Sequence, residues 1–354
     1  MQFPQGKPPI GIIFDSAMGS RIDDVLAMAL MYGLDGKNEA RVVSVSVSRS
    51  NVNSAAFSEA IGRFYAGAVS GDFGAVGRNL PVGLATDGRI AGETPMLTVP
   101  LEKKDKDGKP VYAHGIHHVV DTAEVAALLR NAFTSQYDQN CLVVLAGPAT
   151  NLVQTLRLPG VKDLISQKVR LLSIVAGDFG GGPAEFNIKA DIAAARELFA
   201  EWPTQIIFAG AELGAQLKYP AASIESDFAY TQDHPVVDAY KAFRAMPYDA
   251  PAPGVAAVLA AIRPKENYFK MSPSGTVKVL DDGTTQFVPS PTGKHQYLIS
   301  DPEKKDAVQK VMIELVSAKP VPKAPRFRRN QKKDAADPAK PAVVLEEKPP
   351  PVKE

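Results

Sequence analysis

Three carboxylates lie close together near the amino terminus. Asp15 follows the apolar run 11–14, and Asp23 and Asp24 stand immediately before a longer apolar stretch. Carboxylates in the first turn of a helix are favoured by the helix dipole, so capping and surface exposure account for Asp23 and Asp24 taken singly. They do not account for three acids together. Clustered carboxylates are suited to binding a hard cation or the hydroxyls of a polyol.

The elements around these acids would place them at one edge of a sheet. The apolar run 11–14 is typical of a buried strand, Gly19 indicates a turn, and the apolar spacing after Asp24 predicts a helix. In an open α/β sheet, ligands bind in the crevice outside the carboxyl ends of the strands. We therefore expect Asp15, Asp23 and Asp24 to face that crevice.

Two later segments carry polar side chains directly after apolar strands. Thr150 and Asn151 follow the predicted strand 141–145, and we expect them to cap the next helix. Glu185 and Asn187 follow the predicted strand 169–175 and a glycine-rich turn. In extended backbone these two side chains would point to one face and could hold adjacent hydroxyls. The alternative leaves Glu185 in solvent, with Asn187 turning the chain and Phe186 as the buried contact.

These segments together resemble the inosine-uridine-preferring nucleoside hydrolases. The family signature Asp-x-Asp-x-Gly, followed by Asp-Asp before a helix, is matched by Asp15, Gly19, Asp23 and Asp24. Gly-Pro-x-Thr-Asn-Leu at 147–152 and Ala-Glu-Phe-Asn at 184–187 match two further motifs. The resemblance covers roughly residues 9–300. It implies an α/β fold, with an open, mostly parallel sheet, helices on both faces and a small peripheral hairpin, which we expect around 281–283.

The resemblance also implies an activity and roles for single residues. Family members hydrolyse the N-ribosidic bond of nucleosides, and a calcium ion binds the attacking water and two ribose hydroxyls. Asp15, Asp23 and Asp24 would be the catalytic residues. The calcium ligands would be Asp24, Asp15 and the backbone carbonyl of Ala146. Substrate contacts would come from Asn51, Glu185, Asn187, His114 and Asp249.

Two expected calcium ligands are missing. The second Asp of the signature, which also helps to deprotonate the water, is Ala17 here, and the Asp that opens a late helix is Gly254. Asp249 is the nearest carboxylate upstream and could be recruited. Because calcium affinity follows the number of carboxylates, we expect weak binding. Three functions stay open: a divergent nucleoside hydrolase, a ribose- or nucleoside-binding homologue without catalysis, and a hydrolase of another glycosyl substrate that needs no tightly bound metal.

Composition limits the classes of partner and the cellular location that we expect for this protein. The chain has 354 residues, 45% of them hydrophobic, and a formal net charge of +1, so charge does not suggest a nucleic-acid partner. Its one cysteine, Cys141, lies in an apolar strand, which argues against a disulfide scaffold. No apolar run approaches the roughly 20 residues that span a bilayer. We expect a cytoplasmic homo-oligomer acting on a small molecule; a removed secretion leader is the alternative, because Met1 lies close to the first strand.

The chain is predicted to form a single folded domain. We place an amino-terminal extension at 1–8, the nucleoside-hydrolase-like domain at 9–318, and a tail rich in Pro, Lys and Glu at 319–354 that we expect to be disordered. Residues 68–110, with many glycines and a charged run, are predicted to be mainly loop. A loop of that length in a compact domain is often a lid.

Overall fold

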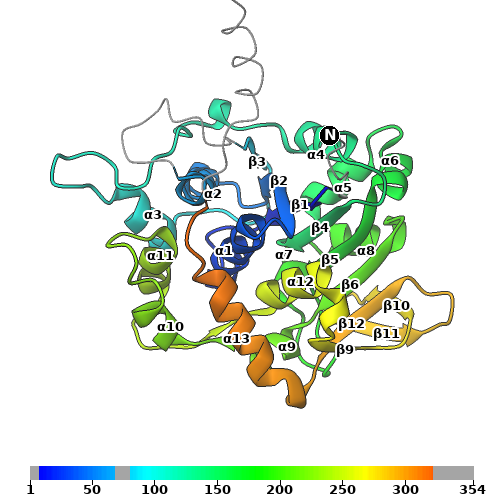
Figure 1. The fold of residues 1–354 in the computed structure, drawn as a ribbon. Helices are drawn as coiled ribbons and strands as arrows, with labels where there is room; N and C mark the ends of the chain where they lie inside the picture. Colours follow the sequence, from blue (N-terminus) through cyan, green and yellow to red (C-terminus); the bar gives the residue numbers. More distant parts are fainter. Residues whose placement is uncertain (1–7, 68–79, 322–354) are drawn as a thin grey trace, which may run out of the picture. The chain divides into compact units, whose positions relative to one another are not determined.

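The computed structural model describes residues 8–67 and 80–321. Its centre is a ten-stranded sheet in the order β11-β10-β12-β6-β5-β4-β1-β2-β3, with β9 paired to β12 (Figure 1). The strands that pair in parallel are β1 (Ile10–Ser16), β2 (Ala40–Val47), β3 (Val82–Leu84), β4 (Cys141–Ala146), β5 (Val169–Val175), β6 (Gln205–Ala209) and β12 (His295–Ser300). The expectations for residues 1–7, 68–79 and 322–354 lie outside the described residues.

Strand order reverses at β1. From β1 the chain continues to β2 and β3 on one side, then returns to place β4, β5 and β6 on the other. In such sheets the connections on the two sides of the reversal diverge, which leaves a crevice at the carboxyl ends of the central strands. The carboxyl ends of β1 and β4 meet there, with Ser16 in register with Ala146.

Helices cover both faces of the sheet, as Figure 1 shows. The helices that pack on the face shared with the first helix are α1 (Ile22–Gly36), α2 (Val52–Tyr65), α3 (Pro95–Glu102), α9 (Ala211–Gln216), α10 (Ala221–Ser226), α11 (Pro235–Phe243), α12 (Pro253–Ile262) and α13 (Lys305–Val316). The opposite face carries α4 (Val125–Thr134), α5 (Thr150–Leu156), α6 (Val161–Lys168), α7 (Phe186–Ala190) and α8 (Ile192–Glu201). This arrangement confirms the predicted fold class.

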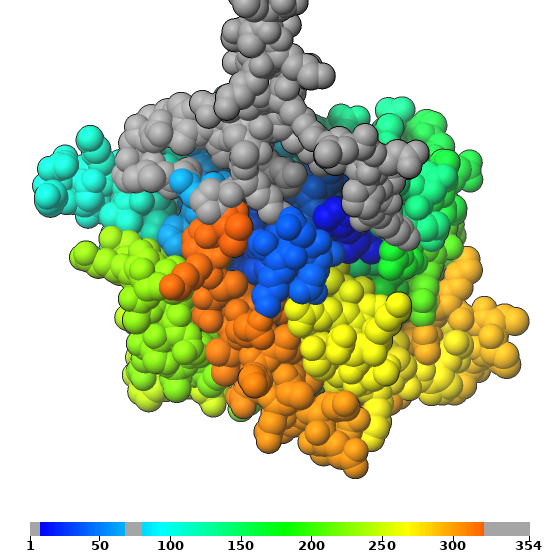
Figure 2. Space-filling model, viewed as in Figure 1, coloured from blue at the N-terminus to red at the C-terminus, as the bar shows by residue number. Residues whose placement is uncertain are grey.

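Side-chain alternation along the strands divides the core into two main layers. On β1, Phe14 packs with the α1 side and Ile13 with the α4 side, and both are fully buried. Adjacent residues of a strand point to opposite faces, so one buried strand supplies both layers. In Figure 2, α13 forms part of an orange band on the surface, and it packs on α1.

The remaining elements are short. The predicted hairpin is present as β10 (Gly275–Val279) and β11 (Thr285–Pro289), which are antiparallel and extend the sheet, and β9 (Phe269–Met271) pairs with β12. A separate ribbon joins β7 (Lys218–Tyr219) to β8 (Ala250–Pro251). Single 3₁₀ turns are η1 (Val119–Asp121), η2 (Pro264–Glu266) and η3 (Pro302–Lys304). Within 8–67 and 80–321, no helix has the length and apolar character needed to cross a bilayer.

Helix α3 is the main departure from the predicted loop at 68–110. Its sequence, PMLTVPLE, contains two prolines, which indicate a break rather than a helix. Pro95 occupies the first helical turn, where its missing N–H costs nothing, and Met96 and Leu97 are fully buried. Packing of these side chains, not local propensity, makes the segment helical.

Candidate active site

Asp15 lies near the carboxyl end of β1, where parallel pairing places it in register with Ser46 of β2. Its Oδ2 accepts hydrogen bonds from the Ser46 hydroxyl at 2.5 Å and from Nδ2 of Asn151 at 2.7 Å. Its Oδ1 is buried and unpartnered in the described part of the chain. Burial raises the pKa of Asp15 to about 7, and the two hydrogen bonds limit the rise. The carboxyl group is therefore fixed in orientation and keeps one free acceptor.

Asp24 lies in the first turn of α1 and is fully buried. Neither of its carboxylate oxygens has a hydrogen-bond partner among the described residues. Burial raises the pKa of Asp24 to about 8; the Arg21 guanidinium opposes the rise, and the charges of Asp23, Glu185 and Asp15 add to it. Two buried, unpaired oxygens on one side chain indicate that a partner from outside the chain belongs there.

Asp15, Asp23, Asp24 and Glu185 form an acid cluster, and Arg21 adds a positive charge to it. Its Nη1 donates to Oε1 of Glu185 at 3.1 Å, its Nη2 donates to the carbonyl of Ala146 at 3.4 Å, and the side chain is 26% exposed. Burial disfavours the guanidinium, but Glu185, Asp24 and Asp23 outweigh burial, so the pKa of Arg21 is raised. Arg21 is a site residue that sequence reasoning missed. Its position just before the Asp-Asp pair, where a helix would take a capping residue, was the available signal.

The charge of Asp23 acts on Arg21 and Asp24, but its oxygens accept hydrogen bonds from the start of a different helix. Oδ2 accepts from the backbone N–H of Gly254 at 2.6 Å, and Oδ1 accepts from that of Val255 at 3.4 Å. These two residues open α12, which has no side-chain cap of its own. Burial raises the pKa of Asp23 to about 6, with Arg21 and the two N–H groups opposing the rise.

Glu185 and Asn187 lie at the start of α7 and not in extended backbone. Glu185 is the N-cap of α7, and its Oε2 accepts from the backbone N–H groups of Asn187 and Ile188. The prediction of two side chains on one extended face is therefore wrong. The alternative is also wrong, because Glu185 is buried and Phe186 is 44% exposed.

Asn187 links the ends of two strands. Its Nδ2 donates to the carbonyls of Ala146 at 3.1 Å and Val175 at 2.8 Å, which are the last residues of β4 and β5. Its Oδ1 is buried and unpartnered within the described ranges. Asn187 therefore adds another free acceptor at the same end of the sheet.

Asn151 was expected to cap α5, and this prediction is wrong. The N-cap of that helix is Ala149, while Asn151 is fully buried and donates to Asp15. Thr150 donates to Oδ2 of Asp191 instead of capping. Asn151 is a site residue that sequence reasoning misassigned, because an amide after a strand is compatible with both roles.

Residues 90–97 cover the turn between β1 and α1. Arg49 donates to the carbonyls of Ala91 and Gly92 and to the Ser20 hydroxyl, and the Thr94 hydroxyl donates to the carbonyl of Gly19. Gly19 has a φ of 101°, and a Cβ there would lie 2.6 Å from Cδ1 of Leu97. A glycine is therefore required by both the backbone and the close cover.

The sequence was then compared with known families. Residues 12–319 match the model of the family described as inosine-uridine preferring nucleoside hydrolase. The chain belongs to this family. A search of curated protein sequences finds no match.

Solved structures share the fold at low sequence identity. A plant nucleoside hydrolase is 19% identical with a TM-score of 0.61, and the match covers 88% of this chain and 100% of that one. The Bacillus anthracis inosine-uridine preferring nucleoside hydrolase is 16% identical with a TM-score of 0.59, and the match covers 87% of this chain and 99% of that one. The type III effector protein XopQ, complexed with adenosine diphosphate ribose, is 13% identical with a TM-score of 0.64, and the match covers 89% of this chain and 96% of that one. At these identities the likeness shows the fold alone.

Three other residues that the family resemblance nominated have contacts elsewhere. Asn51 caps α2 through Oδ1, and its Nδ2 donates to Gly92 and Glu93. The Nδ1 of His114 contacts the carbonyl of Ile116 at 3.1 Å. Asp249 is exposed and accepts from the N–H of Ala221, which begins α10. None of these contacts joins the cluster, so the ligand-binding roles of these residues stay predictions.

The donor set of this family member does not fit a calcium ion. Calcium takes roughly six to eight oxygen ligands, most of them carboxylates in tight sites. Asp15 and Asp24 offer free oxygens, but the Ala146 carbonyl already accepts hydrogen bonds, and Ala17 and Gly254 bring no donor side chain. Across 8–67 and 80–321, no group of three or more His, Cys, Asp or Glu is placed to hold a metal ion. We therefore derive no catalytic step through calcium.

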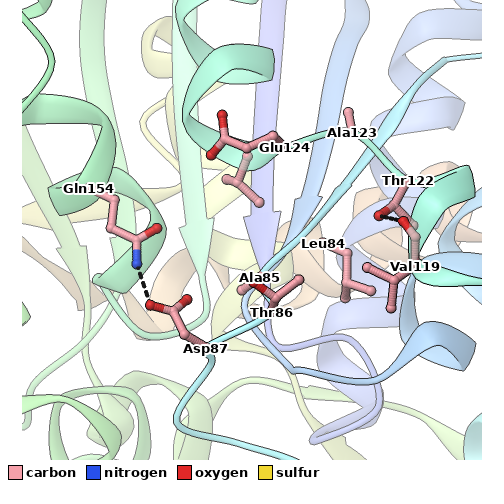
Figure 3. A pocket seen from close by; sticks show the side chains of 10 residues that line it. Leu84, Ala85, Thr86, Asp87, Val119, Thr122, Ala123, Glu124 and Gln154 are labelled. Atoms are coloured by element: carbon pink, nitrogen blue, oxygen red, sulfur yellow. Dashed lines mark hydrogen bonds between the residues drawn. The ribbon is translucent and has the colours of Figure 1, made fainter.

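A separate pocket of about 240 Å³ lies beside the end of β3 and the start of α4. Figure 3 shows Gln154 of α5 donating to Asp87 across it. Glu124 points its oxygens at the N–H groups of Ala126 and Ala127. Gln154, Asp87 and Glu124 are thus paired already, and none of the predicted site residues lines this pocket.

Proposed function

We propose that this protein hydrolyses the N-glycosidic bond of a nucleoside or a related ribosyl compound, with water attacking the anomeric carbon. The proposal rests on one observation above all: free, buried acceptor oxygens of Asp15, Asp24 and Asn187 gather where the strand order reverses. Acceptors without donors call for a hydroxyl-rich ligand. Family membership supports a ribosyl compound as that ligand.

The two free carboxyl groups suit different tasks. Asp15 has one oxygen held by Ser46 and Asn151 and a pKa of about 7, so its free Oδ1 can take a proton from water near neutral pH. Asp24 has two free oxygens, which can accept from two adjacent hydroxyls of a sugar ring. Asp23, with a pKa of about 6, is mostly ionised near neutral pH, and its negative charge favours a transition state with oxocarbenium character.

A second candidate function is binding without turnover. Arg21 lies against the acids, and an arginine charge opposes the positive charge that develops on the sugar. Ala17 also removes a carboxylate that the family uses to deprotonate the water. A ribose- or nucleoside-binding homologue would keep the acceptor oxygens and lose the reaction.

The test is a panel of nucleosides, with adenosine diphosphate ribose added because a solved structure of this fold holds it. Free ribose is measured after incubation with wild type and with Asp24→Asn. We expect wild type to release ribose from at least one compound and Asp24→Asn to lose about 100-fold or more in kcat/KM. We also expect Asp24→Asn to raise Tm, because the amide removes an uncompensated buried carboxyl.

Asp163→Asn is the matched control, since Asp163 is an exposed acid in the first turn of α6. It should leave kcat/KM unchanged and lower Tm by no more than about 2 °C, because an exposed acid in a first helical turn gains little from the helix dipole. If no compound yields ribose but wild type binds ribose or a nucleoside by calorimetry, the binding function replaces the hydrolytic one. Neither binding nor turnover would contradict both proposals.

A further inference from the structure

Arg21 is a locally unfavourable residue for its position. It is the N-cap of α1 and makes no side-chain cap hydrogen bond. N-caps are preferentially Ser, Thr, Asp or Asn, because an oxygen there accepts from the first N–H groups, and arginine has no acceptor. A positive charge at a helix amino terminus is also opposed by the helix dipole. Something other than helix formation must favour arginine here.

Contacts of the guanidinium with the acid cluster offset this unfavourable position. The guanidinium lies between Glu185 and the Ala146 carbonyl, which belong to the segments after β5 and at the end of β4. Its charge acts on Asp23, Asp24 and Glu185. Arg21 thus connects α1 to the end of β4, where the family resemblance places the Ala146 carbonyl as a calcium ligand, and to Glu185, which the resemblance assigns to the substrate.

The same contacts leave little room for a divalent ion. Such an ion would have to compete for the Ala146 carbonyl, which Arg21 and Asn187 both use. It would also lie close to a permanent positive charge, and like charges repel strongly where water is excluded. The two missing carboxylates, at Ala17 and Gly254, reduce the attraction that could offset this repulsion.

We infer that Arg21 is the resident cation of this acid cluster and that the site works without calcium or another divalent metal. The guanidinium neutralises part of the acid charge and ties Glu185 and Ala146 together, while Asp24 and Asp15 keep free oxygens for the ligand. This inference concerns the metal and not the substrate. It can therefore fail while the proposed hydrolysis or binding holds, and the reverse is equally possible.

The experiment measures calcium binding in the absence of any nucleoside. Wild type, Arg21→Lys and Arg21→Gln are compared by thermal unfolding in EDTA and in about 10 mM CaCl₂, and wild type is also titrated with calcium by calorimetry. We expect no calcium heat with wild type, and for both wild type and Arg21→Lys we expect the Tm in EDTA and the Tm in CaCl₂ to agree within about 1 °C. For Arg21→Gln we expect calcium to raise Tm by about 2 °C, the shift that a site of millimolar affinity gives a domain of this size.

Arg49→Gln is the matched control, because Arg49 is a second arginine near this turn, itself buried, that donates to backbone carbonyls and Ser20 instead of acids. Calcium should not stabilise it. A stoichiometric calcium heat with wild type, or a fall in its Tm in EDTA, would overturn the inference. So would an Arg21→Gln protein that folds but gains no stabilisation from calcium. If Arg21→Gln does not fold, the wild-type titration alone decides.

Discussion

Unpaired acceptors are costly in buried positions, and within the described ranges Asp15, Asp24, Asn151 and Asn187 each keep at least one carboxylate or amide oxygen without a partner. Each of these side chains is anchored by its neighbours or its helix so that a free oxygen remains. Residues that served only stability would not be arranged so, since nearly all buried polar groups in folded proteins are paired. At the scale of single residues, the site is thus recognised by what its side chains leave unbonded.

His234 shows the opposite case, a buried titratable group whose bonds are all made. Its Nδ1 accepts from the backbone N–H of Val236, its Nε2 contacts the Tyr230 hydroxyl at 2.9 Å, and its ring packs against Phe64 and Phe228. Burial lowers the pKa of His234 from 6.5 to about 3. The unfolded chain therefore binds one more proton than the folded one between these values.

The prediction is a loss of stability on acidification that depends on His234. Because the folded pKa is lowered, this contribution is complete above about pH 6.5 and is lost as pH falls towards 3. Between pH 7.5 and 5 the wild type should lose about 2 kcal/mol more than His234→Asn, which keeps a capping acceptor but does not titrate. Urea unfolding at the two pH values measures the difference. Equal losses in the free energy of unfolding in wild type and His234→Asn would show that His234 does not cause the pH dependence.

At the scale of elements, two helices share one carboxylate. Asp23 belongs to α1 but caps α12, so the helix that carries the acids also orders the start of the one packed against it. The contact requires a glycine, since a Cβ at Gly254 would lie 2.7 Å from Oδ2 of Asp23. A carboxylate at this position would displace Asp23, which explains physically why the family's helix acid cannot simply be restored here.

A double-mutant cycle tests this link. Gly254→Ala should lower the free energy of unfolding by about 1–3 kcal/mol, because the new methyl group crowds a buried, hydrogen-bonded carboxyl. In an Asp23→Ala background the same change should cost at least about 1 kcal/mol less, since the crowded group is gone. Equal costs in the two backgrounds would show that Gly254 and Asp23 are not coupled. Denaturant unfolding of the four proteins gives the comparison.

At the scale of the whole molecule, the sheet joins two core layers into one structure. β1 is an inner strand of the sheet, between β2 and β4, and contributes Ile13 to one layer and Phe14 to the other. Since the parallel strands β1 and β4 are buried on both faces, neither layer can be lost without exposing the other side of the same strands. The site at the carboxyl ends of these strands therefore rests on both layers.

We expect a single unfolding transition that responds to either layer. Ile13→Ala and Phe14→Ala should each destabilise the protein by about 2–5 kcal/mol and lower the same calorimetric transition. Val288→Ala, at a position 37% exposed on β11, should move it little. Two transitions, each sensitive to only one of the core variants, would show that the layers unfold independently.

The sequence by itself determined the elements that carry the acids. Apolar runs predicted β1, β4 and β5, and the Asp-Asp pair opens α1 as predicted. The family and the fold class followed from three motifs in the right order. These features depend on local periodicity and turn chemistry, which a chain encodes in neighbouring residues.

Only the tertiary structure decided which side chains meet. That Asn151 holds Asp15, that Asp23 caps α12, and that Arg21 lies between Glu185 and Ala146 depend on strand register and helix packing. The paired residues are far apart in the chain, and each polar side chain had an equally good local use, as a cap or at the surface. The choice between a local and a distant partner is made by burial, because a polar group removed from water must take whatever partner the fold brings to it.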